Sequence, residues 1–240
     1  MTLRGPIALL KDSVSFYKTH FKPLLTLVLL PTALLAIGSY GMEIYTAGDA
    51  IPPNATSLAV LAFFVVLTTA AVILSIVSYI ALVLFVAHPS QYSTAIAAYQ
   101  EARKHFFPYL WVSVLVSLAV GGGLLLLIVP GIIFGVWFGF ATLVVVLEQK
   151  RGMEALRESK RLVKGRLSAV FSRLLLLIVP GIVTMLAFSF FIGFFVPDET
   201  AATALSDGIG SIVVVPVMMI YLYFLYTDLK QNPPKVATVA

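Results

Sequence analysis

The sequence predicts an all-α integral membrane protein: a six-helix bundle of three helix pairs, with an amphipathic interfacial helix before each pair. Hydrophobic residues make up 60% of the 240 residues and charged residues only 11%, against roughly 25% charged in soluble domains. The apolar residues form charge-free stretches of about twenty or more, the length that crosses a hydrocarbon layer of about 30 Å. Shorter segments between them carry apolar residues at helical spacing beside Lys and Arg. Residues 1–240 are therefore treated as a single transmembrane domain.

Six membrane-spanning helices are predicted from the charge-free stretches. The stretch from Phe106 to Leu147 holds roughly 42 residues, which would measure about 63 Å as one helix, twice the hydrocarbon thickness. It should therefore fold back on itself, and the predicted turn lies at Val129, Pro130 and Gly131. The spans are expected at about residues 23–42, 58–87, 107–128, 131–147, 167–196 and 209–227.

A seven-span alternative treats Pro180 and Gly181 as a second turn. It leaves only about 13 residues for one span, well short of the length a membrane requires. It also places Lys230 and Lys235 on the outer side. Proline is tolerated as a kink in buried transmembrane helices, which favours six spans.

Three shorter segments are predicted to lie at the membrane surface, at about residues 2–21, 92–105 and 153–164. In the third, apolar residues and cations occupy neighbouring arcs of a helix that should lie flat, with its apolar arc in the interface. Because a surface helix precedes each pair of spans, we interpret the chain as three related units. The nonapeptide LLLLIVPGI, which occurs at both 124–132 and 174–182, supports an internal repeat. The apolar arc of the third segment holds Ala155, Leu156, Ser159, Leu162 and Val163.

The positions of the cations predict the orientation, because Lys and Arg accumulate in short cytoplasmic segments. With six spans, all 16 Lys and Arg residues fall on one side. Arg173, near the start of the fifth span, is expected to reach the interface through its long side chain. We therefore expect a multi-pass protein of the cell (plasma or inner) membrane with both termini cytoplasmic. The opposite loops hold only acids, at Glu43, Asp49, Asp198, Glu199 and Asp207.

Three glycines in the predicted fourth span, Gly131, Gly135 and Gly139, are spaced by four and share one helix face. Such a face lets another helix approach closely. Packing within the bundle is the preferred interpretation. Homodimerisation and a functional hinge remain alternatives.

The sequence offers no residues for chemistry. There is no cysteine, and the three histidines, His20, His88 and His105, do not cluster, so no metal site, cofactor or catalytic group is expected. Glu148 ends the fourth span and is expected to pair with Arg157 or Arg161. We predict that the protein is not an enzyme.

A resemblance to a known group rests on Ile128-Val129-Pro130-Gly131-Ile132, Trp137, the segment from Val144 to Glu148, and the segment from Glu154 to Gly165. These residues resemble bacterial membrane proteins grouped around the glycerophosphoryl diester phosphodiesterase membrane domain and the uncharacterised YciC-like proteins. The match is best over roughly residues 120–180 and implies the six-helix pattern. In the phosphodiesterases of that group a separate soluble barrel performs the hydrolysis, and this chain has no room for it. The resemblance therefore implies a membrane module without hydrolase activity.

The cationic arc of the third surface segment is the candidate binding face, made of Arg157, Lys160, Arg161 and Lys164. It suits anionic lipid headgroups or an acidic partner protein; a purely topological role is the competing interpretation. The expected function is a non-enzymatic membrane module that engages lipid, a protein partner or a second copy, and not nucleic acid. The alternative is a transporter or permease subunit for a small or lipidic substrate, and a membrane-embedded enzyme ranks third.

Overall fold

The computed structural model describes residues 3–47, 55–92 and 94–233, and this part of the chain is helical without strands. Asp49 and Lys235, used above for orientation, and the predicted start of the first surface helix at residue 2 lie outside these residues. The elements in chain order are α1 (Pro6–Thr19), α2 (Phe21–Ala47), α3 (Ala55–Ala87), α4 (Ala95–Ala102), the 3-10 turn η1 (Arg103–His105), α5 (Phe106–Leu126), α6 (Ile128–Phe138), α7 (Ala141–Glu148), α8 (Gly152–Val163), α9 (Leu167–Phe195) and α10 (Glu199–Gln231).

Six of the described segments are long and apolar enough to cross a membrane, as a multi-pass membrane protein requires. They correspond to α2, α3, the run from α4 to α5, the run from α6 to α7, α9 and α10. Pro180 lies inside α9, which continues to Phe195, so the turn of the seven-span alternative is absent. Helix α10 begins about ten residues before the predicted span, because Asp198 caps its first turn by accepting a hydrogen bond from the backbone N of Ala201 at 2.6 Å.

The turn between α5 and α6 lies earlier than predicted. Leu127 is the extended residue that breaks the helix, with φ −162° and ψ 147°. Val129, Pro130 and Gly131 belong instead to the beginning of α6. Proline is compatible with this position because the first N–H groups of a helix have no acceptor within it.

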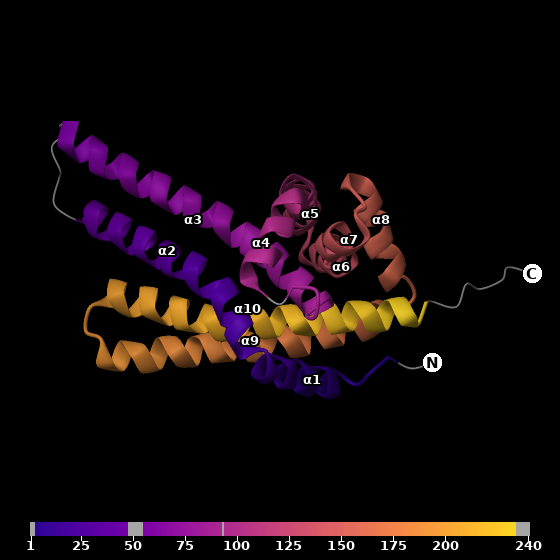
Figure 1. Cartoon of the computed structure of the whole chain (residues 1–240). Helices are drawn as coiled ribbons and strands as arrows, with labels where there is room; N and C mark the ends of the chain where they lie inside the picture. The colour runs from indigo at the N-terminus through magenta and orange to yellow at the C-terminus, as the bar shows by residue number, and fades with distance from the viewer. Residues whose placement is uncertain (1–2, 48–54, 93, 234–240) are drawn as a thin grey trace, which may run out of the picture.

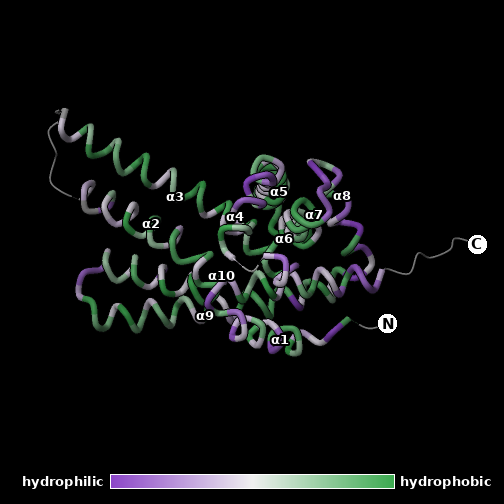
Figure 2. The backbone as a smooth tube through the Cα atoms, viewed as in Figure 1, coloured by the Kyte–Doolittle hydropathy of each residue, from purple (hydrophilic) through white to green (hydrophobic). Residues whose placement is uncertain are grey.

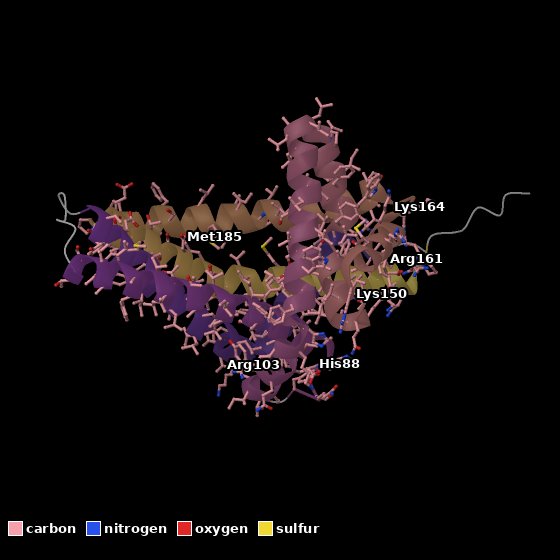
Figure 3. All side chains as sticks on the ribbon, turned by 90° about the horizontal axis from the view of Figure 1, so that it is seen from above. His88, Arg103, Lys150, Arg161, Lys164 and Met185 are labelled. Atoms are coloured by element: carbon pink, nitrogen blue, oxygen red, sulfur yellow. The ribbon has the colours of Figure 1, made fainter. Side chains whose placement is uncertain are left out.

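The helices do not all run in one direction. Figure 1 shows α2, α3, α9 and α10 extending toward the same side of the molecule, with α8 toward the other side and α4 near the middle. The hairpin of α5 and α6 runs across α9 and α10, as Figure 1 and Figure 3 both show. This crosswise hairpin is the main difference from the bundle expected from the sequence.

The apolar surface is distributed as a membrane environment requires. Figure 2 shows hydrophobic residues along most of α3, α5 and α9 and hydrophilic residues gathered over α8. At the tip of the α5–α6 hairpin, Leu125 is 91% exposed and Leu126 is 79% exposed; on α9, Phe190 is 82% exposed. In contact with water, such a surface would be unfavourable, whereas lipid hydrocarbon covers it without cost.

Glycines mediate close helix contacts, but not the three that were predicted as one face. A Cβ added to Gly131 would collide with Leu124 of α5, including its backbone N at 2.8 Å. A Cβ on Gly135 would meet nothing within 4 Å, and one on Gly139 would meet two backbone carbonyl oxygens, those of Gly135 at 2.9 Å and Val136 at 3.9 Å. The shared packing face is therefore wrong, because the neighbouring helix passes only the first of these glycines. Close contacts occur instead at Gly38 and Gly41 between α2 and α3, at Gly123 and Gly131 between α5 and α6, and at Gly210 between α9 and α10.

Candidate functional site

Helix α8 presents one covered face and one open face. The predicted apolar arc is buried, with Ala155 and Ser159 fully covered, and it packs against α5, α6 and α7. The expectation that this arc enters the membrane interface is therefore wrong, since protein already covers it. The four predicted cations lie on the opposite, exposed side; we call Arg157, Lys160, Arg161 and Lys164 the basic face.

Ser159 locks α8 to the break between α6 and α7. Its hydroxyl donates to the carbonyl of Trp137 at 2.7 Å and accepts from the backbone N–H of Phe140 at 3.2 Å. Both backbone groups lie where the predicted fourth span changes from α6 to α7, so they need partners outside their own helices. The hydroxyl of Ser159 therefore supplies both backbone groups with a hydrogen-bond partner and fixes how α8 is rotated against α6 and α7.

The four residues of the basic face are not equivalent. Arg161 donates two hydrogen bonds from Nε to Glu158, at 3.1 and 3.2 Å, and Lys160 Nζ lies 4.0 Å from the centre of the Trp137 ring. Within the described residues, the side chains of Arg157 and Lys164 form no hydrogen bond and no ion pair. These two cations are free to bind an external anion.

A network of ion pairs lies beneath the basic face, with largely buried carboxylates and more exposed lysines. Glu158 is 8% exposed, and its Oε2 lies 2.9 Å from Lys150 Nζ. The same ammonium lies 3.1 Å from Glu148, which also pairs with Lys230 at 3.2 Å. Tyr226 donates its hydroxyl hydrogen to Glu148 at 2.5 Å. The network therefore joins the ends of α7 and α10 to α8.

This network corrects the pairing expected for Glu148. Its partners are Lys150 and Lys230, not Arg157 or Arg161. Gln149 adopts a left-handed conformation with φ 57°, which ends α7 and turns the chain so that Lys150 returns to the helix end. Lys230 comes from the far end of the chain, and its proximity follows from tertiary packing that sequence spacing does not reveal.

The neighbouring cations of the network keep the carboxyl group of Glu158 ionised. Hydrogen bonds from Arg161 and then Lys150 lower the pKa of Glu158 below its ordinary value, outweighing the opposite effect of burial. The hydrogen bond with Glu158 in turn raises the pKa of Lys150. Glu158 is therefore a charged, internally paired group. On the open side of α8, Glu154 is the acid that remains exposed among the cations.

A second polar cluster, which the sequence did not reveal, holds the residues just before α1. Asp228 is 4% exposed and accepts a hydrogen bond from the backbone N of Arg4 at 2.8 Å. The guanidinium of Arg173 donates to the carbonyls of Arg4 at 2.8 Å and Leu3 at 3.2 Å. Arg173 was expected to extend to the membrane interface, but it holds the N-terminal segment instead.

A pocket of about 290 Å³, lined by apolar and polar residues together, lies between α2 and α10. Its lining includes Thr32, Ser39, Asp207 and Ser211. Asp207 lies about two turns inside α10, whereas the sequence placed it in an outer loop because the predicted span began at residue 209. Asp207 is exposed at this pocket.

Residues that could hold a metal do not converge. Within the described residues, no group of three His, Cys, Asp or Glu side chains is close enough to bind an ion. His20 stacks on Phe16 with ring centres 4.3 Å apart, and His105 lies 3.9 Å from Glu101.

Fold and site together define a multi-pass helical membrane protein with a basic surface over a network of ion pairs. Neither a protein-family model, nor a curated protein, nor a solved structure matches this chain. The resemblance to the phosphodiesterase membrane domain and YciC-like proteins therefore stays a prediction.

Proposed function

We propose that this protein is a non-enzymatic membrane module whose basic face binds anionic lipid headgroups at the cytoplasmic surface of the cell membrane. The observation that carries the proposal is the sorting of charge on α8. Glu158 is paired internally with Lys150 and Arg161, while Arg157 and Lys164 are exposed and free of partners within the described residues. Because Glu158 is paired within the protein, it does not cancel the positive charge of Arg157 and Lys164, and this exposed charge attracts a negatively charged ligand.

The proposed orientation places the six apolar segments in the membrane and both termini in the cytoplasm. The described Lys and Arg residues fall in or beside α1, η1, α8 and the adjoining ends of α9 and α10. The opposite ends of these apolar segments carry Glu43 near the end of α2, and Asp198 and Glu199 at the start of α10, in keeping with the positive-inside rule. Because α5 and α6 form a hairpin, they return the chain to the side it left, however deep the tip reaches. The crosswise hairpin therefore leaves the proposed sides of the other segments unchanged.

The expected strength is modest. A Lys or Arg near an anionic leaflet contributes about 1 kcal/mol, so the two free cations together supply about 2 kcal/mol. The partly engaged Lys160 and Arg161 add less, because each already interacts within the protein. Binding should therefore weaken as salt is raised.

The test is a charge-neutralising double variant, Arg157→Gln with Lys164→Gln, of the full chain. After mild extraction from membranes containing phosphatidylglycerol, the retained anionic lipid is measured by mass spectrometry. We expect retention to fall in the variant and, for the unmodified protein, to fall with added salt. The matched control is Lys11→Gln with Lys18→Gln, which removes the same charge from the exposed side of α1.

Unchanged retention in the α8 variant would contradict the proposal and leave the basic face with a purely topological role. An equal loss in both double variants would also contradict it, since the effect would then follow total charge. Recovery of an acidic protein in place of lipid would assign the face to a protein partner.

A transporter is the second candidate, favoured by the pocket that contains Asp207 between α2 and α10. A carboxylate beside the hydroxyls of Thr32, Ser39 and Ser211 is suited to a cation or a proton. The test is proton and sodium flux into vesicles that contain the purified protein. A flux that is lost in Asp207→Asn but kept in Glu199→Gln would favour transport. If no flux is measured for the unmodified protein, the non-enzymatic membrane module remains the proposed function.

A further inference from the structure

An open groove of about 580 Å³ lies between α3 and the segment that runs from α4 to α5. It is separate from the basic face: Figure 3 shows Arg103, beside this groove, well apart from Arg161 and Lys164. Its walls are almost entirely apolar, and one charged side chain, Arg103, is in its lining. The contrast between long apolar walls and one cation indicates the kind of molecule that fits.

The apolar wall is a continuous stripe along α3. Leu67, Ala70, Leu74 and Val77 recur at helical spacing and line the groove together. At 1.5 Å per residue, the stripe from Leu67 to Val77 is about 15 Å long. Phe106 of α5 forms part of the opposite wall. A groove of this length and character suits an extended hydrocarbon chain.

The cation lies toward the Val77 end of the stripe. Ser78 and Tyr99 both donate hydrogen bonds to the carbonyl of Leu27, the latter at 2.7 Å, which places α4 beside this part of α3. Arg103 follows Tyr99 by about one helical turn. The groove therefore begins at a cation on the cytoplasmic side and continues along α3 away from it.

Arg103 is available for a ligand. Its side chain is exposed, and no described residue forms a hydrogen bond or an ion pair with it. Its neighbour Lys104 differs, because Lys104 Nζ is 2.7 Å from Glu101. The hydroxyl of Tyr99, the other polar group in the lining, is already donated to Leu27. The guanidinium is thus the free donor at this end of the groove.

We propose that the groove binds one anionic phospholipid, with an acyl chain along the α3 stripe and its phosphate against Arg103. A guanidinium matches phosphate oxygens through two parallel hydrogen bonds. A free phosphate would leave the apolar walls unused, so the groove selects a lipid. This site does not depend on the basic face of α8, and each can fail without the other.

The test uses phosphatidylglycerol with a photoreactive group in its acyl chain, mixed with the full chain in lipid micelles. After illumination, we expect cross-links in the α3 peptide that contains residues 67–77, and competition by unlabelled phosphatidylglycerol. Arg103→Gln should lower the yield about five-fold, which corresponds to losing about 1 kcal/mol for one cation. Ala70→Trp should lower it as well, because the indole would fill the groove.

The matched control is Lys104→Gln, which removes the neighbouring charge but does not alter the groove lining. It should keep the cross-linking yield, as should the Arg157→Gln with Lys164→Gln variant. Arg103→Lys should recover part of the yield and shows that the loss in Arg103→Gln is not caused by unfolding. Unchanged yield in both Arg103→Gln and Ala70→Trp would overturn the proposal. So would a dimer in which a second copy covers the α3 stripe.

Discussion

The hydroxyl of Ser159 on α8 donates a hydrogen bond to the carbonyl of Trp137 at the end of α6. It also accepts from Phe140, so Ser159→Ala would leave two buried backbone groups without partners. Leaving such groups unsatisfied costs about 1 to 3 kcal/mol. We expect a clear fall in the apparent Tm of the purified protein in detergent. The control is Ser168→Ala, an exposed serine near the start of α9. Equal Tm values for the two variants would show that the bridge to Trp137 does not stabilise the fold.

The contact between α5 and α6 predicts different outcomes for two glycines of the same helix. In Gly131→Ala, the new Cβ would lie 2.8 Å from the backbone N of Leu124, and overpacking of this kind costs about 1 to 3 kcal/mol. In Gly135→Ala, the Cβ enters open space, and the higher helix propensity of Ala should be neutral or slightly stabilising. Thermal unfolding of both variants measures the difference. If Gly131→Ala proves as stable as Gly135→Ala, the two helices do not approach as described.

The buried carboxylate predicts a dependence of stability on pH. The pKa of Glu158 is lowered in the folded protein by its bonds to Arg161 and Lys150. Its contribution to stability is therefore complete above the ordinary value of 4.5 and is lost as the pH falls through the lower folded-state pKa. Glu158→Gln should be less stable than the unmodified protein at neutral pH, and the gap should narrow below about pH 4.5.

Unfolding of both proteins between neutral and acidic pH measures that gap. Glu154→Gln is the control, because Glu154 is an exposed carboxylate on the same helix, and it should follow the unmodified protein. A gap of constant size across the whole range would mean that the ionisation of Glu158 does not support the fold.

The tip of the α5–α6 hairpin is expected to stay in hydrocarbon. Leu127 and Ile128 at the turn are 68% and 70% exposed, and their neighbours from Leu124 to Val129 are all apolar. Exposing such a turn to water is unfavourable. The chain has no cysteine, so a cysteine introduced at Leu127 can be labelled without background. It should react slowly with a membrane-impermeant maleimide from either side, whereas efficient outside labelling would show that the hairpin crosses completely.

Composition and hydropathy predicted much of the fold. Charge-free length alone is enough to identify helices that can cross a membrane, because the constraint comes from the bilayer thickness. Helical spacing identified the residues that share the apolar arc of α8, but the expectation that this arc enters the membrane interface was wrong. The packing of α5, α6 and α7 against this arc was not predicted, since residue spacing does not show whether lipid or another helix contacts it.

The candidate site was only partly accessible from the sequence. The residues of the basic face follow from the spacing of Arg157, Lys160, Arg161 and Lys164. Their division into free and engaged cations depends on Glu158, which lies three residues before Arg161 on the same helix, and on Trp137, which tertiary packing brings against Lys160. Lys230 and Arg103 had no local signal, because their roles depend on elements far apart in the chain. The prediction of the glycine contacts was wrong for the same reason, because the spacing of residues shows which of them share a helix face but not which helix packs against that face.

The basic face can bind lipid at the cytoplasmic surface only if α8 lies on the cytoplasmic side of the membrane. Single cysteines at Thr46, Ser90, Met153, Ala201 and Gln231 can each be tested in intact cells with a membrane-impermeant maleimide, because the chain has no cysteine of its own. We expect labelling from outside at Thr46 and Ala201, and labelling of Ser90, Met153 and Gln231 only after the membrane is made permeable. Labelling of Met153 in intact cells would place the basic face outside and contradict the proposed binding of lipid at the cytoplasmic surface.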